Sequence, residues 1–280
     1  MKKILFKTEF FNPKDTLECG QVFRFIPYGN GYAVHALDKR AHVYTDGENT
    51  VVVCNDNDQE FFAEYFDLKR DYKSICDSAL KSGYPVLTRS ATLGKGIRIL
   101  NQDKIETLFS FIISQNNNIP RIKGIIERLC TALGERKEFD GQVYYAFPTV
   151  QKMSEMDEDF YKSIGLGYRA GYIKKLADDI VQGLDINAFS KLDTNTLKTR
   201  LTQLYGVGPK VCDCVALFGF HRSDSFPVDT WIAKVYEQDF YGTLKDRKKI
   251  SEWFVKSYGE NAGYFQQYLF YYKRSLEEKV

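Results

Sequence analysis

Hydrophobic positions in the first 55 residues fall into short runs separated by glycine-containing turns. Residues 21–37 have the pattern of a strand, a Gly-Asn-Gly turn and a second strand, and residues 40–54 repeat it around an Asp-Gly turn. Successive short strands joined by tight turns predict an antiparallel meander. Residues 58–81 then change to helical spacing, which is carried by Phe61, Phe62, Tyr65 and Phe66.

Beyond about residue 99 the hydrophobic pattern predicts helices throughout. Residues 103–114 carry apolar side chains three and four positions apart. The next helix has Asn118 as its candidate cap, Pro120 in its first turn and Gly134 at its end. Two further helices, the second rich in aromatic residues, are predicted over residues 168–183 and 262–280.

Length and composition fit this plan. A chain of 280 residues has room for one large domain or two ordinary ones, and 44% hydrophobic and 15% aromatic residues can form a sizeable core. We expect an α+β fold with two domains. The first is an N-terminal antiparallel β domain with flanking helices over residues 1–98, and the second is an all-α domain over residues 99–280.

The charge balance excludes a protein that simply coats nucleic acid. The formal net charge is only +2, although a local basic groove remains compatible with that total. The first apolar run is short and is broken by Lys7 and Glu9, unlike a signal peptide. No stretch approaches 18 apolar residues, so we expect a cytoplasmic protein without a membrane span.

The cysteines suggest neither a disulfide framework nor a metal site. In a cytoplasmic protein they are expected to be reduced thiols. Only two lie close together, and a C-x-C pair without partners is a poor metal signature, so we expect Cys212 to serve in packing. The last 66 residues contain no cysteine. The six are Cys19, Cys54, Cys76, Cys130, Cys212 and Cys214.

The stretch "LYGVGPKVCDCV" at residues 204–215 predicts a tight bend followed by a helix. Gly206 and Gly208 permit backbone angles that other residues resist, and they allow a neighbouring chain to approach closely. Pro209 suits the first position of a helix. Amide groups at such a bend and helix start point outward and form a ready site for phosphate.

Lys210 stands in the first turn of that helix, where the helix dipole disfavours a cation by roughly 0.3–1 kcal/mol. The helix dipole therefore favours the neutral amine form of Lys210, which is a nucleophile. Helical spacing places Lys210 and Cys214 on one face. Asp229 precedes a further helix as its candidate cap. From these residues alone, Lys210 could also be a surface or phosphate-binding lysine, and Asp229 a cap and nothing more.

Residues 204–229 resemble the helix-hairpin-helix DNA glycosylase superfamily, with the hairpin motif at about residues 200–219. In that superfamily a lysine at the start of the second motif helix and an aspartate 19 residues later perform the chemistry. Lys210 and Asp229 match both positions. The combination of hairpin, lysine and "PVD" is highly specific.

Further stretches resemble one branch, the 8-oxoguanine DNA glycosylase/lyase family. They are "CGQVFRF" at residues 19–25, "SQNNNIPRI" at 114–122, "IGLGYRAGY" at 164–172 and "GYFQQYLF" at 263–270. The resemblance thus extends over nearly the whole chain. It implies a small antiparallel β domain beside two helical subdomains, with the active site between the subdomains.

The resemblance implies a monomeric, nucleoid-associated enzyme that binds double-stranded DNA containing an oxidised purine. A damaged base must first be flipped out of the duplex, as the glycosylases that illustrate base flipping do. Neutral Lys210 then attacks the sugar C1′ and expels the base, while the Asp229 carboxylate stabilises positive charge on the sugar. The resulting Schiff base permits β-elimination, so the enzyme both excises 8-oxoguanine and cuts the strand.

The resemblance also assigns the residues that hold the distorted DNA. Asn116 fills the gap, Tyr168 wedges into the stack, and Arg121 and Arg169 contact the opposite cytosine. Asn offers a donor and an acceptor, Tyr is flat, and Arg forms forked hydrogen bonds to base edges. Without the resemblance these would be turn, packing and phosphate-binding residues. The full set of DNA and opposite-base contacts is Asn116, Arg121, Tyr168, Arg169, Gly206 and Gly208.

The base pocket implied by the resemblance has four members. Phe270 and Cys214 sandwich the base, and Gln266 reaches its pairing edge. The backbone carbonyl of Gly20 accepts from the N7 hydrogen, which 8-oxoguanine has and guanine lacks. Leaving a buried acceptor unpaired costs about 1–3 kcal/mol. Taken alone, Phe270 would be core, Gly20 a glycine at a strand start and Gln266 an exposed helix residue.

Two features separate this chain from relatives in the superfamily. Many members hold an iron–sulfur cluster with four cysteines near the carboxyl end, and this chain has none there. We therefore expect no cofactor and no metal ligands, apart from a loosely bound cation at the hairpin carbonyls. Eukaryotic members usually carry His two residues after the aspartate, where this chain has Trp231.

Two other functions stay open at this point. One is a glycosylase for another oxidised or alkylated base, which a panel of lesion duplexes would distinguish. The other is a non-enzymatic helix-hairpin-helix DNA-binding module. Phosphate binding needs neither Lys210 nor Asp229 at this spacing, so a covalent adduct trapped by borohydride would separate the enzyme from the module.

Overall fold

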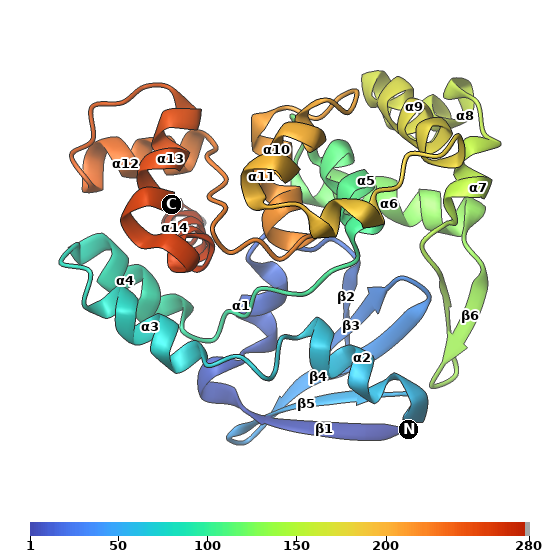
Figure 1. Cartoon of the computed structure of the whole chain (residues 1–280). Coiled ribbons are helices and arrows are strands. Elements are labelled where there is room, and N and C mark those ends of the chain that lie inside the picture. Colours follow the sequence, from blue (N-terminus) through green and yellow to red (C-terminus); the bar gives the residue numbers. More distant parts are fainter. Residues whose placement is uncertain (278–280) are drawn as a thin grey trace.

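The computed structural model describes residues 1–277, and a five-stranded antiparallel sheet forms its N-terminal side (Figure 1). The order of strands is β1-β5-β4-β3-β2. The predicted meander is confirmed, because the last four strands follow one another in both sequence and space. The strand β1 was not predicted: its mostly exposed and lysine-rich sequence gives no clear alternation. The strands are β1 (Lys2–Lys7), β2 (Phe25–Tyr28), β3 (Gly31–Ala36), β4 (Lys39–Asp46) and β5 (Asn49–Cys54).

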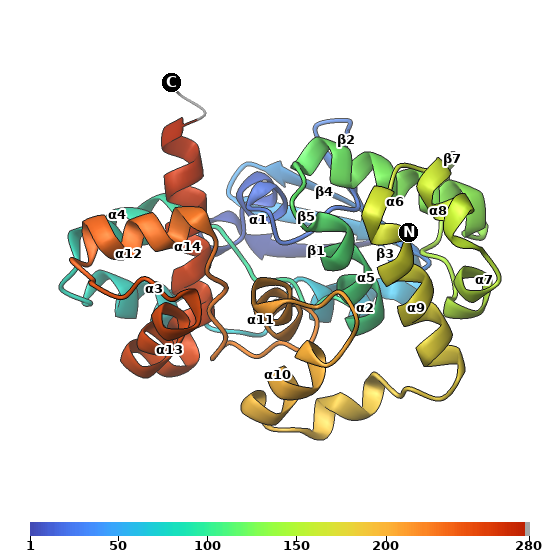
Figure 2. The same ribbon diagram turned by 90° about the horizontal axis from the view of Figure 1, so that it is seen from above.

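Helices fill most of the remaining chain and lie to the left, to the right and below the labelled strands of the sheet in Figure 2. None of the described helices is long and apolar enough to cross a membrane. They are α1 (Pro13–Glu18), α2 (Gln59–Tyr65), α3 (Tyr72–Leu80), α4 (Pro85–Gly94), α5 (Lys104–Ser114), α6 (Ile119–Leu133), α7 (Val150–Ser154), α8 (Glu158–Ser163), α9 (Ala170–Val181), α10 (Thr194–Thr202), α11 (Pro209–Phe218), α12 (Thr230–Asp239), α13 (Arg247–Tyr258) and α14 (Ala262–Glu277).

Three sequence-based expectations need correction or a limit. The helical region 58–81 is two helices, because the chain turns between α2 and α3. The expectation of helices alone beyond residue 99 was wrong: β6 (Arg136–Phe139) and β7 (Gln142–Tyr145) form a hairpin around Asp140 and Gly141, both at positive φ. That Asp-Gly pair is a hairpin signal that the analysis passed over. The end of the predicted helix 262–280, residues 278–280, lies outside the described residues.

The predicted helix caps are confirmed. The Asn118 side chain accepts the backbone N–H of Arg121 at 3.0 Å, and Gly134 follows the last residue of α6. The Asp229 carboxylate accepts the N–H of Ile232 at 2.9 Å at the start of α12. These bonds satisfy N–H groups that have no partner within the helix.

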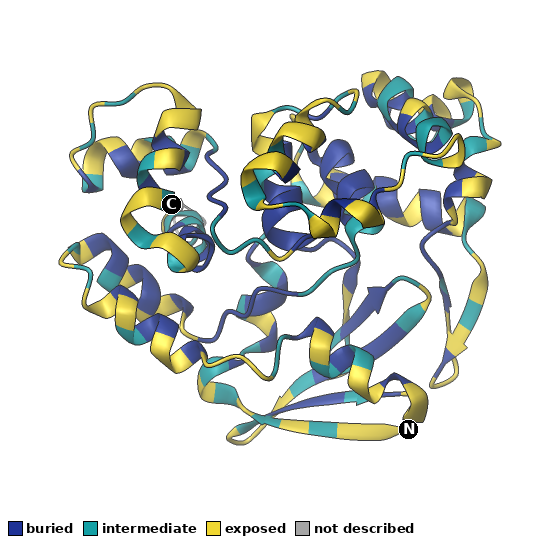
Figure 3. Ribbon diagram, viewed as in Figure 1, coloured by how far each residue is buried: buried dark blue, intermediate teal, exposed yellow. Residues whose placement is uncertain are grey.

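The buried residues form two cores. The smaller lies under the sheet and includes Val34, Val52 and Phe62. The larger runs through the helices, whose buried sides face inward in Figure 3. Helices α3 and α4 join this larger core by packing on α14 (Figure 1). Division of the chain after residue 98 stays a prediction, since part of the segment before that point packs with the helices that follow.

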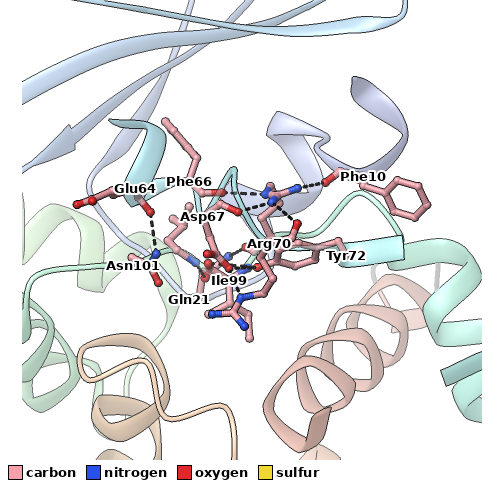
Figure 4. A network of polar contacts seen from close by, with 11 residues as sticks. Phe10, Gln21, Glu64, Phe66, Asp67, Arg70, Tyr72, Ile99 and Asn101 are labelled. Carbon is pink, nitrogen blue, oxygen red and sulfur yellow. Dashed lines mark hydrogen bonds and ion pairs between the residues drawn. The ribbon is translucent and has the colours of Figure 1, made fainter. Parts of the chain in front are cut away.

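Arg98 joins the two cores and is fully buried. Its guanidinium donates to the backbone carbonyls of Phe66 and Phe10, both at 2.8 Å, and of Asp67. Its charge lies 4.0 Å from the centre of the Tyr72 ring. Figure 4 shows the carbonyl-bearing residues of this network gathered around that ring. One side chain therefore ties together the segments before α1 and after α2.

Gln21 extends the same junction towards the N-terminal segment. Its amide nitrogen donates to the carbonyl oxygens of Thr16 at 2.8 Å and Arg98 at 2.7 Å. Its amide oxygen accepts the N–H of Leu100 at 2.8 Å. The segment that carries Gly20 is thereby bonded to the stretch between α4 and α5, which leads into the helical region.

We predict that Arg98→Met destabilises the protein by about 3 kcal/mol or more, because several buried carbonyls lose their donor at once. Urea unfolding monitored by circular dichroism measures the change. Arg89→Met is the matched control, since Arg89 is exposed on α4. Equal unfolding midpoints for the two variants would contradict the junction role of Arg98.

His35 makes stability depend on pH. Its ring is 7% exposed and stacks on the Tyr144 ring at 5.2 Å. Burial, followed by the positive charges of Arg24 and Arg40, lowers the pKa of His35 to about 3 from 6.5. Between these two values the unfolded chain binds the proton and the folded chain does not, so stability falls as pH falls.

Going from pH 7 to pH 5, we expect His35 to remove about 2 kcal/mol of stability, at about 1.4 kcal/mol per pH unit below 6.5. Urea unfolding at both values should show a smaller loss in His35→Gln than in the unsubstituted protein. A loss of equal size in the two proteins would show that His35 is not the group responsible.

Candidate active site

Of the two hairpin glycines before α11, Gly206 has the special backbone conformation that the sequence predicts. Gly206 has a φ of +85°, and a Cβ there would lie 2.4 Å from the Tyr172 ring. Only glycine meets both conditions. Gly208 differs from the expectation, because its φ of −85° suits any residue. Gly208 is the N-cap of α11, and a Cβ added there meets nothing within 4 Å. The glycine therefore leaves open space beside the start of the helix.

Helix α11 starts at Pro209 and presents Lys210 from its first turn. The Lys210 amine lies 5.5 Å from the centre of the Phe111 ring of α5. Cys214, one turn further, is buried on the same face. Burial raises the pKa of the Cys214 thiol to about 11, and the nearby amine of Lys210 opposes this shift only in part. The thiol is therefore protonated and serves as an apolar wall.

A small cavity of about 50 Å³ brings the predicted pocket together. Its walls come from the segment after α1, from α5 and α11, from the start of α12 and from α14. Ligand pockets commonly measure about 300–1,000 Å³, so the walls must move apart before a base can enter. The lining residues are Cys19, Gly20, Phe111, Lys210, Cys214, Phe218, Pro227, Asp229, Gln266, Gln267 and Phe270.

Gly20 is required by its neighbour Phe270. The φ of Gly20 is +88°, and a Cβ there would lie 3.1 Å from the Phe270 ring. Any larger residue would press on the ring as well as strain the backbone. The predicted pocket residues Gly20, Cys214, Gln266 and Phe270 therefore do lie together, beside Lys210 and Asp229.

Two glutamines of the cavity lining have side-chain oxygens without a partner among the described residues. The Oε1 atoms of Gln266 and Gln267 are buried without a hydrogen bond in the part of the chain that the structure describes. Such an acceptor costs about 1–3 kcal/mol, which an N–H group of a bound base would recover. Gln267 was missed by the sequence analysis, because a glutamine in a helix gives no sign of burial. It is only 2% exposed.

The predicted DNA-contact residues occupy a neighbouring surface. Asn116 is exposed between α5 and α6 with a φ of +44°, a conformation that Asn tolerates better than most residues. Arg121 is also exposed, and its guanidinium makes a long bond of 3.4 Å to the Gly165 carbonyl. Tyr168 is 56% exposed. These three side chains are placed to meet a large partner.

Arg169 behaves differently from the other predicted contacts. It is 3% exposed, and its guanidinium donates to the carbonyl of Gln115 at 2.9 Å, of Leu166 at 3.2 Å and of Asn116 at 2.9 Å. In this structure Arg169 therefore supports the loop that carries Asn116. Its contact with an opposite cytosine stays a prediction and requires that some of these bonds break.

Gln115 is the residue that the sequence analysis missed on this surface. Its side-chain nitrogen donates to the Gly206 carbonyl at 2.8 Å. Its own carbonyl accepts from Arg169 at 2.9 Å and from the Tyr168 hydroxyl at 3.4 Å. Gln115 thus connects the hairpin, the Asn116 loop and the exposed tyrosine. No sequence pattern marks it, since its partners are distant along the chain.

Trp231, where the resemblance to eukaryotic members implies His, lies in the first turn of α12 and is partly buried. The Lys234 amine lies 5.4 Å from the centre of its ring. The aromatic ring therefore has a cation as its neighbour within the same helix. Trp231 does not belong to the cavity lining.

The cysteines and acidic residues form no metal centre within residues 1–277. No group of three or more His, Cys, Asp or Glu side chains there could hold an ion. All six cysteines are buried and unpaired. Cys212 contacts the Lys198 carbonyl at 3.4 Å, in keeping with the packing role expected of it.

Family models match the chain in two consecutive parts. Residues 3–108 match the N-terminal domain of 8-oxoguanine DNA glycosylase. Residues 109–258, more than half of the chain, match the HhH-GPD superfamily of base excision DNA repair proteins.

Solved structures and a curated relative agree with these models. The 8-oxoguanine glycosylase/lyase of Clostridium acetobutylicum, in complex with double-stranded DNA containing cytosine opposite 8-oxoG, aligns at a TM-score of 0.90 and 39% identity over 97% of this chain and 94% of that one. MBOgg1, in complex with a low-affinity DNA ligand, aligns at a TM-score of 0.93 and 37% identity over 98% and 96%. A probable N-glycosylase/DNA lyase of Methanothermobacter thermautotrophicus is 31% identical over 200 residues, which cover 64% of each chain.

The fold and the matched segments define a DNA glycosylase of the helix-hairpin-helix class. Within that class, the chain belongs to the 8-oxoguanine DNA glycosylase family. The α+β architecture and the family expected from the sequence are thereby confirmed.

We predict that Gln115→Ala weakens binding to a lesion-containing duplex about fivefold, because the hairpin and the Asn116 loop lose the hydrogen bond that joins them. Fluorescence anisotropy measures the dissociation constant. The loss of one hydrogen bond should lower stability by only about 1 kcal/mol. Gln203→Ala, an exposed change close to the hairpin, is the control. Affinity equal to that of the control would contradict the connecting role of Gln115.

Proposed function

We propose that this protein is a bifunctional DNA glycosylase and abasic-site lyase that excises 8-oxoguanine opposite cytosine from duplex DNA. The observation that carries the proposal is the convergence of Lys210 and Asp229 on one cavity whose lining includes two glutamines with amide oxygens unpaired among the described residues. A nucleophile, a carboxylate and base-recognising groups are the parts that this reaction needs. The named activities of the related proteins support the same conclusion.

Recognition of the extruded base is divided among the walls of the cavity. Phe270 and Cys214 stack on the two faces of the base, and the Gln266 oxygen accepts from an N–H group on its pairing edge. The Gly20 carbonyl accepts the N7 hydrogen of 8-oxoguanine. Guanine offers a lone pair there, so it repels the carbonyl and leaves a buried acceptor unpaired, at a cost of about 1–3 kcal/mol.

Excision begins when the neutral amine of Lys210 donates its electron pair to C1′ of the extruded nucleotide. The bond from C1′ to the base breaks, and the base leaves with the electron pair of that bond and takes up a proton. The nitrogen then loses one proton and the bond from C1′ to the ring oxygen O4′ breaks. O4′ takes up a proton, which gives a protonated Schiff base between Lys210 and C1′. Loss of a proton from C2′ then expels the 3′ phosphate by β-elimination and cuts the strand.

Asp229 stabilises the positive charge that develops on the sugar. Its carboxylate is held by the N–H of Ile232 at 2.9 Å, so the helix start fixes the position of the negative charge before the substrate arrives. A preorganised charge of this kind needs no reorganisation during the reaction, which is the usual source of a large electrostatic effect. The cap and the catalytic group are therefore the same side chain.

The duplex is held open by the exposed surface next to the cavity. Asn116 fills the space left by the extruded nucleotide, and Tyr168 enters the stack on the opposite strand. Arg121, whose bond to the Gly165 carbonyl is long in this structure, reads the base edges of the opposite cytosine. Arg169 joins it once its bonds to the loop carbonyls exchange for the base.

The protein works as a monomer on double-stranded DNA and needs no redox or iron–sulfur cofactor. A loosely bound cation at the hairpin carbonyls remains part of the proposal. The Gly206 carbonyl already accepts from Gln115 at 2.8 Å, so the carbonyls next to it are the ones left for an ion. We place the enzyme in the cytoplasm with the nucleoid, where its substrate lies.

Borohydride trapping on an 8-oxoguanine duplex tests the chemistry. The unsubstituted protein should give a covalent adduct, and Lys210→Gln should give none. Asp229→Asn keeps the cap, because Asn caps helices as well as Asp, but it should slow excision about 100- to 1,000-fold. Lys234→Gln, an exposed change on α12, is the control.

A panel of duplexes with oxidised pyrimidines, alkylated purines and each opposite base completes the test. Fastest excision of 8-oxoguanine opposite cytosine is expected. An adduct that persists in Lys210→Gln, or faster excision of another lesion, would contradict the proposed assignment.

A further inference from the structure

Exposed tyrosines are unevenly distributed over this protein. In the part of the chain that the structure describes, three are more than half exposed: Tyr168 at 56%, Tyr205 at 60% and Tyr241 at 84%. Tyr241 lies in the loop after α12. The other two line one hollow beside the hairpin, although 37 positions separate them in the sequence.

A third tyrosine joins this pair into a row. The Tyr172 ring of α9 lies 6.0 Å from that of Tyr168, at an angle of 82°, and 4.9 Å from that of Tyr205, at 87°. Both contacts are edge-to-face, which is a favourable arrangement for aromatic rings. The outer two rings therefore offer exposed faces while the middle ring holds them in place.

The row is rigid before any partner binds. Gly206 lies so close to Tyr172 that a Cβ would come within 2.4 Å of its ring, and this contact fixes the middle ring against the hairpin. The charge of Arg169 lies 4.4 Å from the centre of the Tyr168 ring. Side chains that are already ordered lose little entropy on binding, so these rings form a surface prepared for contact.

The tyrosines line a hollow of about 450 Å³ between α8, α9 and the hairpin. A hollow of this size accommodates part of a nucleotide, whereas the base cavity beside Lys210 is closed. Helices α8 and α9 lie side by side in Figures 1 and 2. The lining residues are Glu158, Lys162, Gly167, Tyr168, Gly171, Tyr172, Lys175 and Tyr205.

The charges around the hollow do not resemble a phosphate site. Lys162 is paired with Asp159 at 3.0 Å and with Glu158 at 3.8 Å. Lys175 is paired with Asp179. Both lysines therefore have acidic partners already, and the free feature of the hollow is its aromatic surface. Aromatic faces bind sugar and base surfaces by stacking, and this binding depends little on salt.

We propose that Tyr205, supported by Tyr172, extends the Tyr168 wedge into a platform that packs against the sugars and base edges of the nucleotides beside the extruded one. The hollow adjoins the surface assigned to DNA above: Tyr168 lines it, and Gly206 packs on its lining residue Tyr172. This inference rests on the proposed function, because that function puts the distorted duplex at this surface. Tyr205 acts in binding, whereas the cavity around Lys210 acts in excision.

Binding to a duplex with a tetrahydrofuran abasic-site analogue tests the platform. Tyr205→Ala should raise the dissociation constant about tenfold, the equivalent of about 1.4 kcal/mol. The slope of log affinity against log salt should stay unchanged, because no phosphate contact is lost. Tyr205→Phe should bind as the unsubstituted protein does, and Tyr241→Ala is the matched exposed control.

Four results would overturn the proposal. The first is an affinity of Tyr205→Ala equal to that of Tyr241→Ala, and the second is a tenfold loss of affinity in Tyr205→Phe. The third is a salt slope for Tyr205→Ala smaller by about one, because that change marks a lost phosphate contact. The fourth is a slower single-turnover excision rate of Tyr205→Ala at saturating DNA. Thermal melting checks that each variant is folded. The test is independent of the chemistry: a missing borohydride adduct at Lys210 would end the proposed function, while binding to the abasic analogue would still report on Tyr205.

Discussion

The base cavity depends on one constraint, which is that the segment carrying Gly20 must lie against helix α14. A buried arginine and a buried glutamine hold the segment on one side, since the Gln21 amide donates to the Arg98 carbonyl at 2.7 Å. On the other side the Tyr271 hydroxyl of α14 donates to Asp15 at 2.7 Å. The walls of the cavity come from opposite ends of the chain, so neither the β domain nor the helices could form it alone.

The hairpin connects the cavity to the surface proposed to face DNA. Gly206 packs on Tyr172 and accepts from Gln115, and only four positions later Lys210 enters the cavity. The backbone proposed to contact the duplex and the amine proposed for the chemistry therefore belong to one packed unit. The Asn116 loop is bonded to the hairpin through Gln115. The residues proposed to extrude the nucleotide and the amine proposed to attack its sugar are therefore held in fixed positions relative to each other.

The sequence allowed prediction of those site residues whose positions are determined by a short local stretch of the chain. Lys210 and Asp229 follow from a hairpin, a helix start and a cap within 26 residues. Gln115 and Gln267 could not be predicted, because their partners, or the lack of any, exist only after distant segments have packed. The inward direction of the Arg169 guanidinium has the same origin, because two of its three carbonyl acceptors, those of Gln115 and Asn116, lie more than 50 residues earlier in the chain.

The closed state of the cavity bears on how a damaged base is selected. At about 50 Å³ the space holds no purine, so a base can enter only after cavity walls such as Phe270, which packs closely on Gly20, have moved apart. That displacement costs packing energy whichever base arrives, and it must be offset by the hydrogen bonds formed inside. In the proposed mode of recognition, guanine leaves the Gly20 acceptor unpaired, whereas 8-oxoguanine satisfies it. On that proposal, a small difference in hydrogen bonding decides whether the fixed cost of opening is offset, and the base that forms fewer bonds returns to the stack before the proposed attack by Lys210.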